Sequence, residues 1–218
     1  MTIETQPTSP VTLSDRMRKL TAGVVKPIAE LLHNLGVNPD FITLLGLILA
    51  AIAAYFITDD QLLIAAVLLL LSLPLDALDG AVARMLPGPR PFGAFLDSTL
   101  DRYADGALFA ALVVYGVRKD DDLIVTLALF ALIGAYLVSY TRARAEGLGF
   151  ECKIGLFSRM ERTVVLLTLL AVGEFWGDAV TIGLIILAFG TQFTALQRFW
   201  HVWNLCQAQK VEQQEESH

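Results

Sequence analysis

The sequence predicts an all-α, polytopic membrane protein with six transmembrane helices preceded by an amphipathic juxtamembrane helix. Of its 218 residues 55% are hydrophobic, and the mean hydropathy is +0.59. A soluble core of this size needs far less apolar sequence. Long apolar stretches recur along the chain with short polar connections between them, as expected for spanning helices joined by tight loops. The net charge of −6 comes without a clustered basic surface, so we expect no nucleic-acid partner.

The N-terminal region is expected to form a disordered tail, residues 1–12, and then the juxtamembrane helix, residues 13–36. The tail is polar and lacks the apolar segment of a signal peptide. Apolar residues then recur every three or four positions with basic residues between them, which is typical of a helix lying on a membrane with its basic face toward anionic headgroups. The same pattern suits a soluble helix packed on a partner. Pro27 is expected to kink this helix. The apolar positions are Leu13, Met17, Leu20, Val24, Ile28, Leu31 and Leu35, and the basic ones include Arg16, Arg18, Lys19 and Lys26.

The transmembrane domain is expected to cover residues 37–205, followed by a polar, disordered tail, residues 206–218. The dipeptide Asn38-Pro39 is a helix-start signal and opens the first span. Cys152 and Cys206 lack the spacing of metal ligands, and we expect both to be free thiols. The six predicted spans lie at about residues 41–58, 61–85, 92–117, 122–146, 160–175 and 178–204.

The basic residues predict which side of the membrane each connection faces. With the N-terminus in the cytoplasm, fourteen of the sixteen Lys and Arg residues fall on the cytoplasmic side, and only Arg118 and Lys119 fall outside. Six spans return the C-terminus to the starting side. We therefore expect an integral protein of the cytoplasmic membrane with both termini and the functional site on the cytoplasmic side.

Four aspartates interrupt the apolar sequence at the predicted cytoplasmic ends of the second and third spans. Asp76 and Asp79 are three residues apart, and Asp97 and Asp101 are four apart, so each pair shares one helical face. The Pro/Gly-rich break at residues 86–91 ends one helix and starts its antiparallel neighbour, so the two acidic faces are expected to meet. Uncompensated carboxylates in apolar surroundings are costly, and a bound cation resolves this. Oxygen ligands alone favour Mg²⁺ or Mn²⁺, and four carboxylates suit two ions.

The residues around these aspartates form a longer pattern. Asp-x-x-Asp-Gly-x-x-Ala-Arg is followed, after eight residues, by Gly-x-x-x-Asp-x-x-x-Asp. This pattern resembles the signature of the CDP-alcohol phosphotransferase (CDP-alcohol phosphatidyltransferase) family and matches it at all eight defining positions. Small residues in it leave room for a ligand and allow the two helices to approach each other. The eight positions are Asp76, Asp79, Gly80, Ala83, Arg84, Gly93, Asp97 and Asp101.

The resemblance implies an enzyme that transfers a phosphatidyl-type group from a CDP-linked lipid, CDP-diacylglycerol, to an alcohol and releases CMP. It also implies that Asp76, Asp79, Asp97 and Asp101 bind the metal ions, and that Asp101 is the base that removes the proton of the acceptor hydroxyl. Members of the family are usually homodimers. The residues that the resemblance assigns to the CDP-lipid site are Pro39, Gly80, Ala83, Arg84, Arg90 and Gly93.

A second informative stretch is the basic connection between the fourth and fifth predicted spans. Its five cations beside a metal-bound diphosphate predict an anionic second substrate, a small phosphorylated alcohol. The run Thr-Arg-Ala-Arg-Ala-Glu and the later Arg-x-x-Arg are similar to the phosphatidylinositol phosphate synthase branch of the family, which implies inositol phosphate as the acceptor and glycerol phosphate as runner-up. Each cation also suits a purely topological role at lipid headgroups. The five are Arg142, Arg144, Lys153, Arg159 and Arg162.

Three other functions are compatible with parts of the sequence. A cation-coupled transporter that uses the aspartates as an ion site would place acids near mid-membrane, on discontinuous helices. The sequence shows neither inverted repeats nor acids in the middle of a span. A phosphatidylglycerophosphate synthase belongs to the same family and differs only in its acceptor. A non-catalytic scaffold is disfavoured by the intact aspartates.

Asp105 extends the acidic series by one turn outside the family pattern, and we expect it to form an internal pair rather than bind metal.

Overall fold

The computed structural model describes residues 13–216, and side chains from residue 23 to residue 210 together with that of Gln214. The predicted disordered tail, residues 1–12, and the side chains of Arg16, Arg18 and Lys19 lie outside this description. Over the described range the chain is all-α, as predicted, and contains no strand. The helices are α1 (Leu13–Asn34), α2 (Pro39–Thr58), α3 (Leu62–Ala83), α4 (Pro91–Arg118), α5 (Asp122–Glu146), α6 (Arg159–Gly173) and α7 (Asp178–Glu216).

Local sequence signals explain where most of these helices begin and end. Asn38 caps α2, because its side chain accepts a hydrogen bond from the amide of Asp40 at 3.0 Å, and Pro39 follows it in the first turn. Asp121 caps α5 in the same way. The Pro/Gly-rich break separates α3 from α4, with Pro91 as the first residue of α4. Each of the six predicted spans therefore corresponds to one observed helix, with boundaries within a few residues for all except the C-terminal end of α7.

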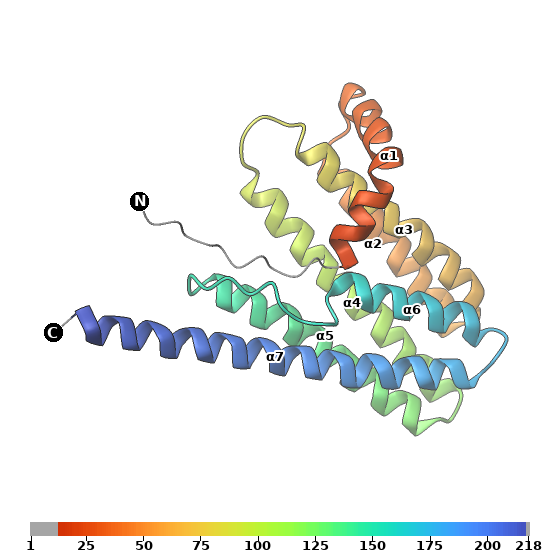
Figure 1. Ribbon diagram of the computed structural model, residues 1–218. Coiled ribbons are helices and arrows are strands. Elements are labelled where there is room, and N and C mark those ends of the chain that lie inside the picture. Colours follow the sequence, from red (N-terminus) through yellow and green to blue (C-terminus); the bar gives the residue numbers. More distant parts are fainter. Residues whose placement is uncertain (1–12, 217–218) are drawn as a thin grey trace.

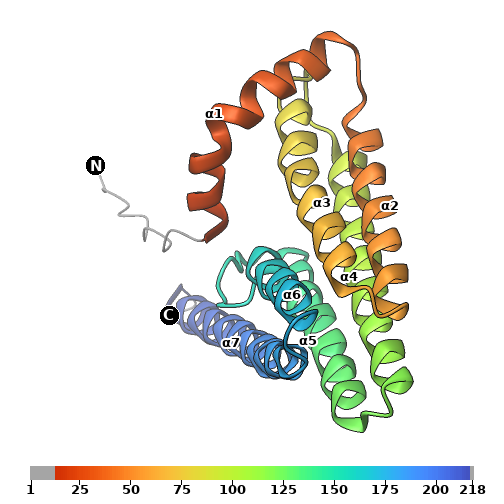
Figure 2. The same cartoon turned by 90° about the vertical axis from the view of Figure 1, so that its right-hand side faces the viewer.

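Helices α2 to α7 pack as a closed ring. Helix α2 packs against α3 and α4, α3 packs against α6, α6 against α7, α7 against α5, and α5 against α4. Figure 1 and Figure 2 show the two halves of this ring, with α2, α3 and α4 alongside one another and α5, α6 and α7 gathered next to them. Helices α3 and α4, which carry the aspartates, therefore share α2 as a common neighbour. On their other sides, α3 packs against α6 and α4 packs against α5.

Small residues let the helices of the ring approach closely. The main core cluster combines large side chains such as Phe109 and Leu112, both almost fully buried, with many buried alanines of α2, α3 and α5. The clearest example is Gly134 of α5, where a Cβ atom would lie 2.0 Å from Oγ1 of Thr191 in α7. Substituting this glycine would push α5 and α7 apart. Cys152 and Cys206 are free thiols, as expected.

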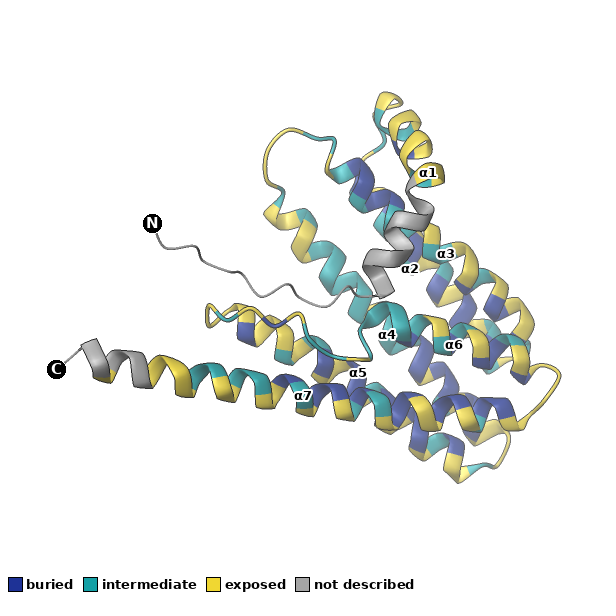
Figure 3. Ribbon diagram, in the orientation of Figure 1, coloured by how far each residue is buried: buried dark blue, intermediate teal, exposed yellow. Residues whose placement is uncertain are grey.

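Helix α1 lies outside the ring and packs on α3. Ala29 is fully buried in a second core cluster with residues of α2 and α3, whereas Val24, Leu31 and Leu35 are exposed. Of the apolar side chains predicted to face the membrane, those that the structure describes, Val24, Ile28, Leu31 and Leu35, are thus exposed, and the intramolecular contact is made by a different strip of the helix around Ala29 (Figure 3). Pro27 lies inside α1, and the helix bends along its length (Figure 2).

Four helices are long and apolar enough to cross a bilayer: α2, α3, α5 and the segment of α7 up to Lys210. Helix α4 is long enough but carries the charged side chains of the acidic cluster, and α6 has only 15 residues. Many large apolar side chains on the outer surface are exposed, which is typical of helices that contact lipid. The expected disorder after residue 205 is wrong for residues 206–216, because α7 continues to Glu216. Its Gln, Glu, Lys and Ala residues are good helix formers.

Candidate active site

The two acidic pairs lie where the sequence places them, at the last two turns of α3 and the first three turns of α4. Asp79 is the most buried of the four, with 6% of its surface exposed, and the other three are half-buried. The acidic faces do not meet by direct packing of α3 on α4. Instead, α2 lies against both helices, and an arginine from α6 reaches between them.

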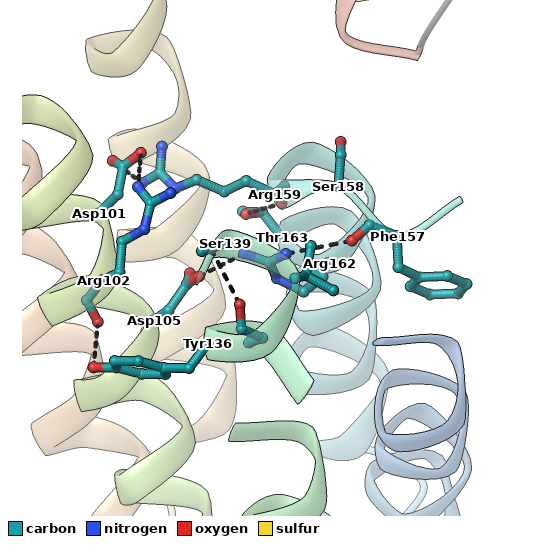
Figure 4. Close-up of polar contacts among 12 residues, drawn as sticks. Asp101, Arg102, Asp105, Tyr136, Ser139, Phe157, Ser158, Arg159, Arg162 and Thr163 are labelled. Atoms are coloured by element: carbon teal, nitrogen blue, oxygen red, sulfur yellow. Dashed lines mark hydrogen bonds and ion pairs between the residues drawn. The ribbon is translucent and has the colours of Figure 1, made fainter. Parts of the chain in front are cut away.

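Arg159 is the residue that joins the two acidic helices. Its Nη1 forms an ion pair with Oδ2 of Asp76 on α3, and its Nη2 lies 2.9 Å from Oδ1 of Asp101 on α4. Figure 4 shows this guanidinium extending from the first turn of α6 to the carboxylate of Asp101. Arg102 adds a weaker contact, with its Nη1 3.6 Å from the second oxygen of Asp101. The single guanidinium of Arg159 therefore pairs with one carboxylate from α3 and one from α4.

Asp79 is held separately, by α2. The hydroxyl of Thr43 donates to Oδ2 of Asp79 at 2.8 Å, and the backbone amide of Gly80 donates to Oδ1. A buried carboxylate with donors on both oxygens has a fixed orientation. Gly46, one turn further along α2, faces Asp76, where a Cβ atom would lie 3.8 Å from Oδ1. Helix α2 thus places a hydroxyl against one aspartate of α3 and a residue without a side chain against the other.

A second ion pair lies deeper between α4 and α6. Nη2 of Arg162 donates to Oδ2 of Asp105 at 2.7 Å, and its Nη1 donates to the carbonyl of Phe157 at 3.3 Å (Figure 4). The side chains are 4% and 14% exposed. The internal pair expected for Asp105 is therefore present. Arg162, predicted to bind the acceptor phosphate, lies inside the bundle, one turn below Arg159 on the same face of α6.

The predicted CDP-lipid residues gather around the start of α2 and the α3–α4 connection. Nη2 of Arg90 lies 2.8 Å from both carboxylate oxygens of Asp40 and 3.4 Å from Oδ1 of Asn38. Gly93 makes room for this pair, because a Cβ atom there would lie 3.4 Å from both Arg90 and Asp40. Arg84 is exposed at the end of α3, and its Nη1 lies over Gly80. Pro39 is buried and Ala83 half-buried.

The other predicted acceptor cations lie further from the aspartates. Arg142 is paired with Glu146 at 2.8 Å and Lys153 with Glu151 at 2.6 Å, and all four side chains are well exposed. The hydrogen bond from Lys153 lowers the pKa of Glu151 below its usual value. Arg144 is exposed near the end of α5. Of the five cations, Arg159 is the one that contacts two of the four signature aspartates, Asp76 and Asp101.

Helix α7 holds the connection that carries these cations. Thr194 accepts a hydrogen bond from the amide of Phe157 at 3.0 Å, and Nε of Arg198 donates to the carbonyl of Ile154 at 2.8 Å. Arg198 also donates to the carbonyl of Val138 on α5. These contacts fix the residues that lead into α6, and hence the direction in which Arg159 leaves the backbone.

The residues present fit a divalent metal. All four carboxylates are oxygen donors, which Mg²⁺ and Mn²⁺ prefer, and the ion pairs of Arg159 bring Asp76 and Asp101 to the two ends of one guanidinium. Among the described residues no three acidic, His or Cys side chains converge on one point, and the Arg159 guanidinium lies between two of the four aspartates. A metal at this position would therefore replace an interaction that Arg159 makes here.

The sequence did not predict the contacts that two residues of α2 make within the site. Thr43 and Asp40 lie 36 and 50 positions from their partners, so no local spacing reveals the contacts. A signal was available for Thr43, because it is a polar residue at the start of a highly apolar helix. Its neighbour one turn later, Gly46, marks the same face as the side of close approach.

Known proteins that are similar to this chain belong to the family whose signature the aspartates resemble. The sequence profile of the CDP-alcohol phosphatidyltransferase family matches residues 36–205. The archaetidylinositol phosphate synthase of Methanothermobacter thermautotrophicus is 36% identical over 193 residues, which cover 87% of this chain and 93% of the relative. The crystal structure of the phosphatidylinositol phosphate synthase of Mycobacterium tuberculosis with CDP-DAG bound has a TM-score of 0.78 at 34% identity, covering 83% of this chain and 94% of that one. The same synthase in complex with manganese and citrate has a TM-score of 0.76 at 34% identity, covering 83% and 89%. The chain belongs to the CDP-alcohol phosphatidyltransferase family and is an enzyme similar to its phosphatidylinositol phosphate synthases.

Proposed function

We propose that this enzyme transfers the phosphatidyl group of CDP-diacylglycerol to inositol phosphate and releases CMP. The observation that carries the proposal is the ion pairing of Arg159 with Asp76 and Asp101, because a cation proposed to bind the acceptor phosphate contacts two of the proposed metal-binding carboxylates. The relatives whose names state an inositol phosphate product support the choice of acceptor.

Asp76, Asp79, Asp97 and Asp101 would hold two divalent ions, Mg²⁺ or Mn²⁺. When bound, the metal supplies charge that neutralises the diphosphate and stabilises the leaving CMP. The chain contributes the fixed orientation of Asp79 and the small residues Gly80 and Ala83, which leave room for the ligand beside α3. Arg84, Arg90, Gly93 and Pro39 complete the CDP-lipid site in this proposal.

Asp101 is the proposed base. Its carboxylate accepts the proton of the acceptor hydroxyl while that oxygen attacks the phosphorus of the lipid, and the bond from phosphorus to the CMP oxygen breaks. Arg159 and Arg102 flank this carboxylate with positive charge at 2.9 and 3.6 Å.

The acceptor phosphate is proposed to bind the cations of the α5–α6 connection and of the start of α6. Arg159 leads this group, and among the described residues its buried Nε has no acceptor, nor has that of Arg162. An N–H donor of this kind can serve a phosphate oxygen. The remaining cations in the proposal are Arg142, Arg144 and Lys153. Glycerol phosphate is the second candidate acceptor, since its phosphate offers the same chemistry.

The proposed membrane arrangement has six spans, α2 to α7, with both termini and the aspartates on the cytoplasmic side. Helix α4 can span despite its charges because Asp101 and Asp105 are turned into the bundle and paired with α6. A helix of 15 residues such as α6 is about 22 Å long and would rely on its neighbours to cross. The active unit is proposed to be a homodimer, as is usual in the family.

The direct test is CMP release by the purified enzyme from CDP-diacylglycerol with a panel of acceptors. We expect inositol phosphate to give the highest kcat/KM, glycerol phosphate a lower value, and free inositol almost none. Faster turnover with an uncharged alcohol would contradict the phosphorylated acceptor and leave the loop cations with a topological role. Failure of every acceptor to release CMP would contradict the proposed reaction as a whole.

A further inference from the structure

The contact between Thr43 and Asp79 has a geometry that suits more than helix packing. The Thr43 oxygen lies 2.8 Å from Oδ2 of Asp79 and 3.1 Å from the carbonyl oxygen of Pro39. A hydroxyl has one proton to donate, and the carboxylate oxygen of Asp79 is the closer of the two acceptors. The Thr43 proton is therefore directed at the carboxylate. Asp79 is 6% exposed, so solvent contributes little to its orientation.

We propose that Thr43 is a positioning residue for the metal ligand Asp79. The inference rests on the proposed metal-dependent function and identifies how one of its four carboxylates is aimed. The χ2 rotation of an aspartate is broad, whereas the β-branched side chain of threonine is stiff at χ1. The hydrogen bond from Thr43 thus fixes one carboxylate oxygen, and the amide of Gly80 fixes the other. Each oxygen keeps a further lone pair that a cation can accept.

The register of α2 against α3 supports this role. Thr43 and Gly46 are three residues apart on one face of α2, as Asp76 and Asp79 are on α3, so each residue of one pair faces one of the other. The hydroxyl meets Asp79, and the missing side chain of Gly46 leaves space beside Asp76. A cavity of about 30 Å³ lies beside this face of α2, and its lining includes Thr43, Gly46, Asp76, Asp101 and Arg159. Thr43 thus stands between this cavity and Asp79, where a hydrogen-bond donor can orient the carboxylate.

Two substitutions separate the hydroxyl from the shape of the side chain. Thr43→Val keeps the branched shape and removes the donor, whereas Thr43→Ser keeps the donor and removes the methyl group. Mn²⁺ binding to each purified variant in detergent, without substrate, is measured from the free Mn²⁺ signal in electron paramagnetic resonance. We expect Thr43→Val to weaken Mn²⁺ affinity by about tenfold or more, the range seen when residues that orient metal ligands are replaced, and Thr43→Ser to stay within about twofold of the unchanged enzyme.

Two further variants keep the result interpretable. Thr43→Ala replaces Thr43→Val if the latter does not fold, as judged by its melting temperature in chelator, and we expect the same loss of affinity. Unchanged Mn²⁺ affinity in the folded Val or Ala variant would overturn the inference, as would a loss in Thr43→Ser equal to that in Thr43→Val. Asp97→Asn is the reference for the metal site itself. If Asp97→Asn loses Mn²⁺ and Thr43→Val does not, the inference fails alone; if Asp97→Asn also binds normally, the proposed metal site fails.

Discussion

Arg162 of α6 donates to the carboxylate of Asp105 on α4 at 2.7 Å, inside the bundle and one turn below the aspartates of the family signature. Both side chains are mostly buried, so each neutralises a charge that would otherwise be stranded in an apolar environment. The pair ties the start of α6 to α4, and Arg159 projects from the same face of α6 toward Asp101. The geometry of the candidate active site therefore depends on an ion pair next to it.

Arg162→Ala is expected to destabilise the enzyme, because it leaves the Asp105 carboxylate buried without its partner. Loss of one member of a buried pair typically costs about 3–5 kcal/mol. Thermal unfolding in detergent should show a clearly lower melting temperature. The double variant Arg162→Met with Asp105→Leu should recover most of the loss, because no unpaired charge remains. If Arg162→Ala instead unfolded at the temperature of the unchanged enzyme, the ion pair with Asp105 would contribute little to stability. A raised KM of the phosphorylated acceptor would be a separate result, which supports the proposed binding of the acceptor phosphate by Arg162.

Asp101→Asn is expected to lower kcat far more than it weakens binding of the CDP-lipid. A base acts mainly in the transition state, so its loss reduces turnover while the ground-state complex persists. Stopped-assay CMP release gives kcat, and nucleotide-lipid binding is measured separately on the same preparation. Asp76→Asn is the matched comparison, since it removes a proposed metal ligand that has no role as a base. Loss of nucleotide-lipid affinity in Asp101→Asn, with turnover of the bound lipid intact, would identify Asp101 as a ligand only.

A reporter fused after Lys210 tests the orientation in the membrane. Fourteen of the sixteen Lys and Arg residues lie on the proposed cytoplasmic side, so the fusion should be active only as a cytoplasmic reporter. A control fusion in the α4–α5 turn, next to Lys119, should give the opposite result. Cytoplasmic signals from both fusions would contradict the six-span arrangement.

The fold was predictable from the sequence to the extent that local patterns determine it. Apolar length, the Asn38-Pro39 start and the Pro/Gly-rich break each act within a few residues, and the corresponding helices begin and end close to the expected positions. The C-terminal end of α7 was not predicted, because polar composition was interpreted as disorder although its residues favour helix.

The positions of the four aspartates on their helices were predictable from the sequence, but the contacts that these side chains make were not. The spacing of the aspartates placed each pair on one helical face, and the structure agrees. It could not show that α2 lies against both acidic helices, or that Thr43 and Asp40 take part. These contacts depend on how three helices pack, which periodicity within one helix does not encode. The three-residue spacing of Arg159 and Arg162 already allowed both to face one site. Only the packing shows that they pair with Asp76, Asp101 and Asp105, whereas Arg142, Arg144 and Lys153 are exposed.

The central claim is that the four aspartates hold divalent metal for transfer of the phosphatidyl group. The most direct measurement is CMP release from CDP-diacylglycerol by the purified enzyme and by Asp97→Asn, each first stripped with chelator and then given Mn²⁺ or Mg²⁺. An amide cannot supply the charge of the replaced carboxylate, so Asp97→Asn should remain folded and inactive with either metal, whereas the unchanged enzyme should lose activity in chelator and regain it when metal returns. Undiminished CMP release in excess chelator, or full activity of Asp97→Asn, would contradict the account.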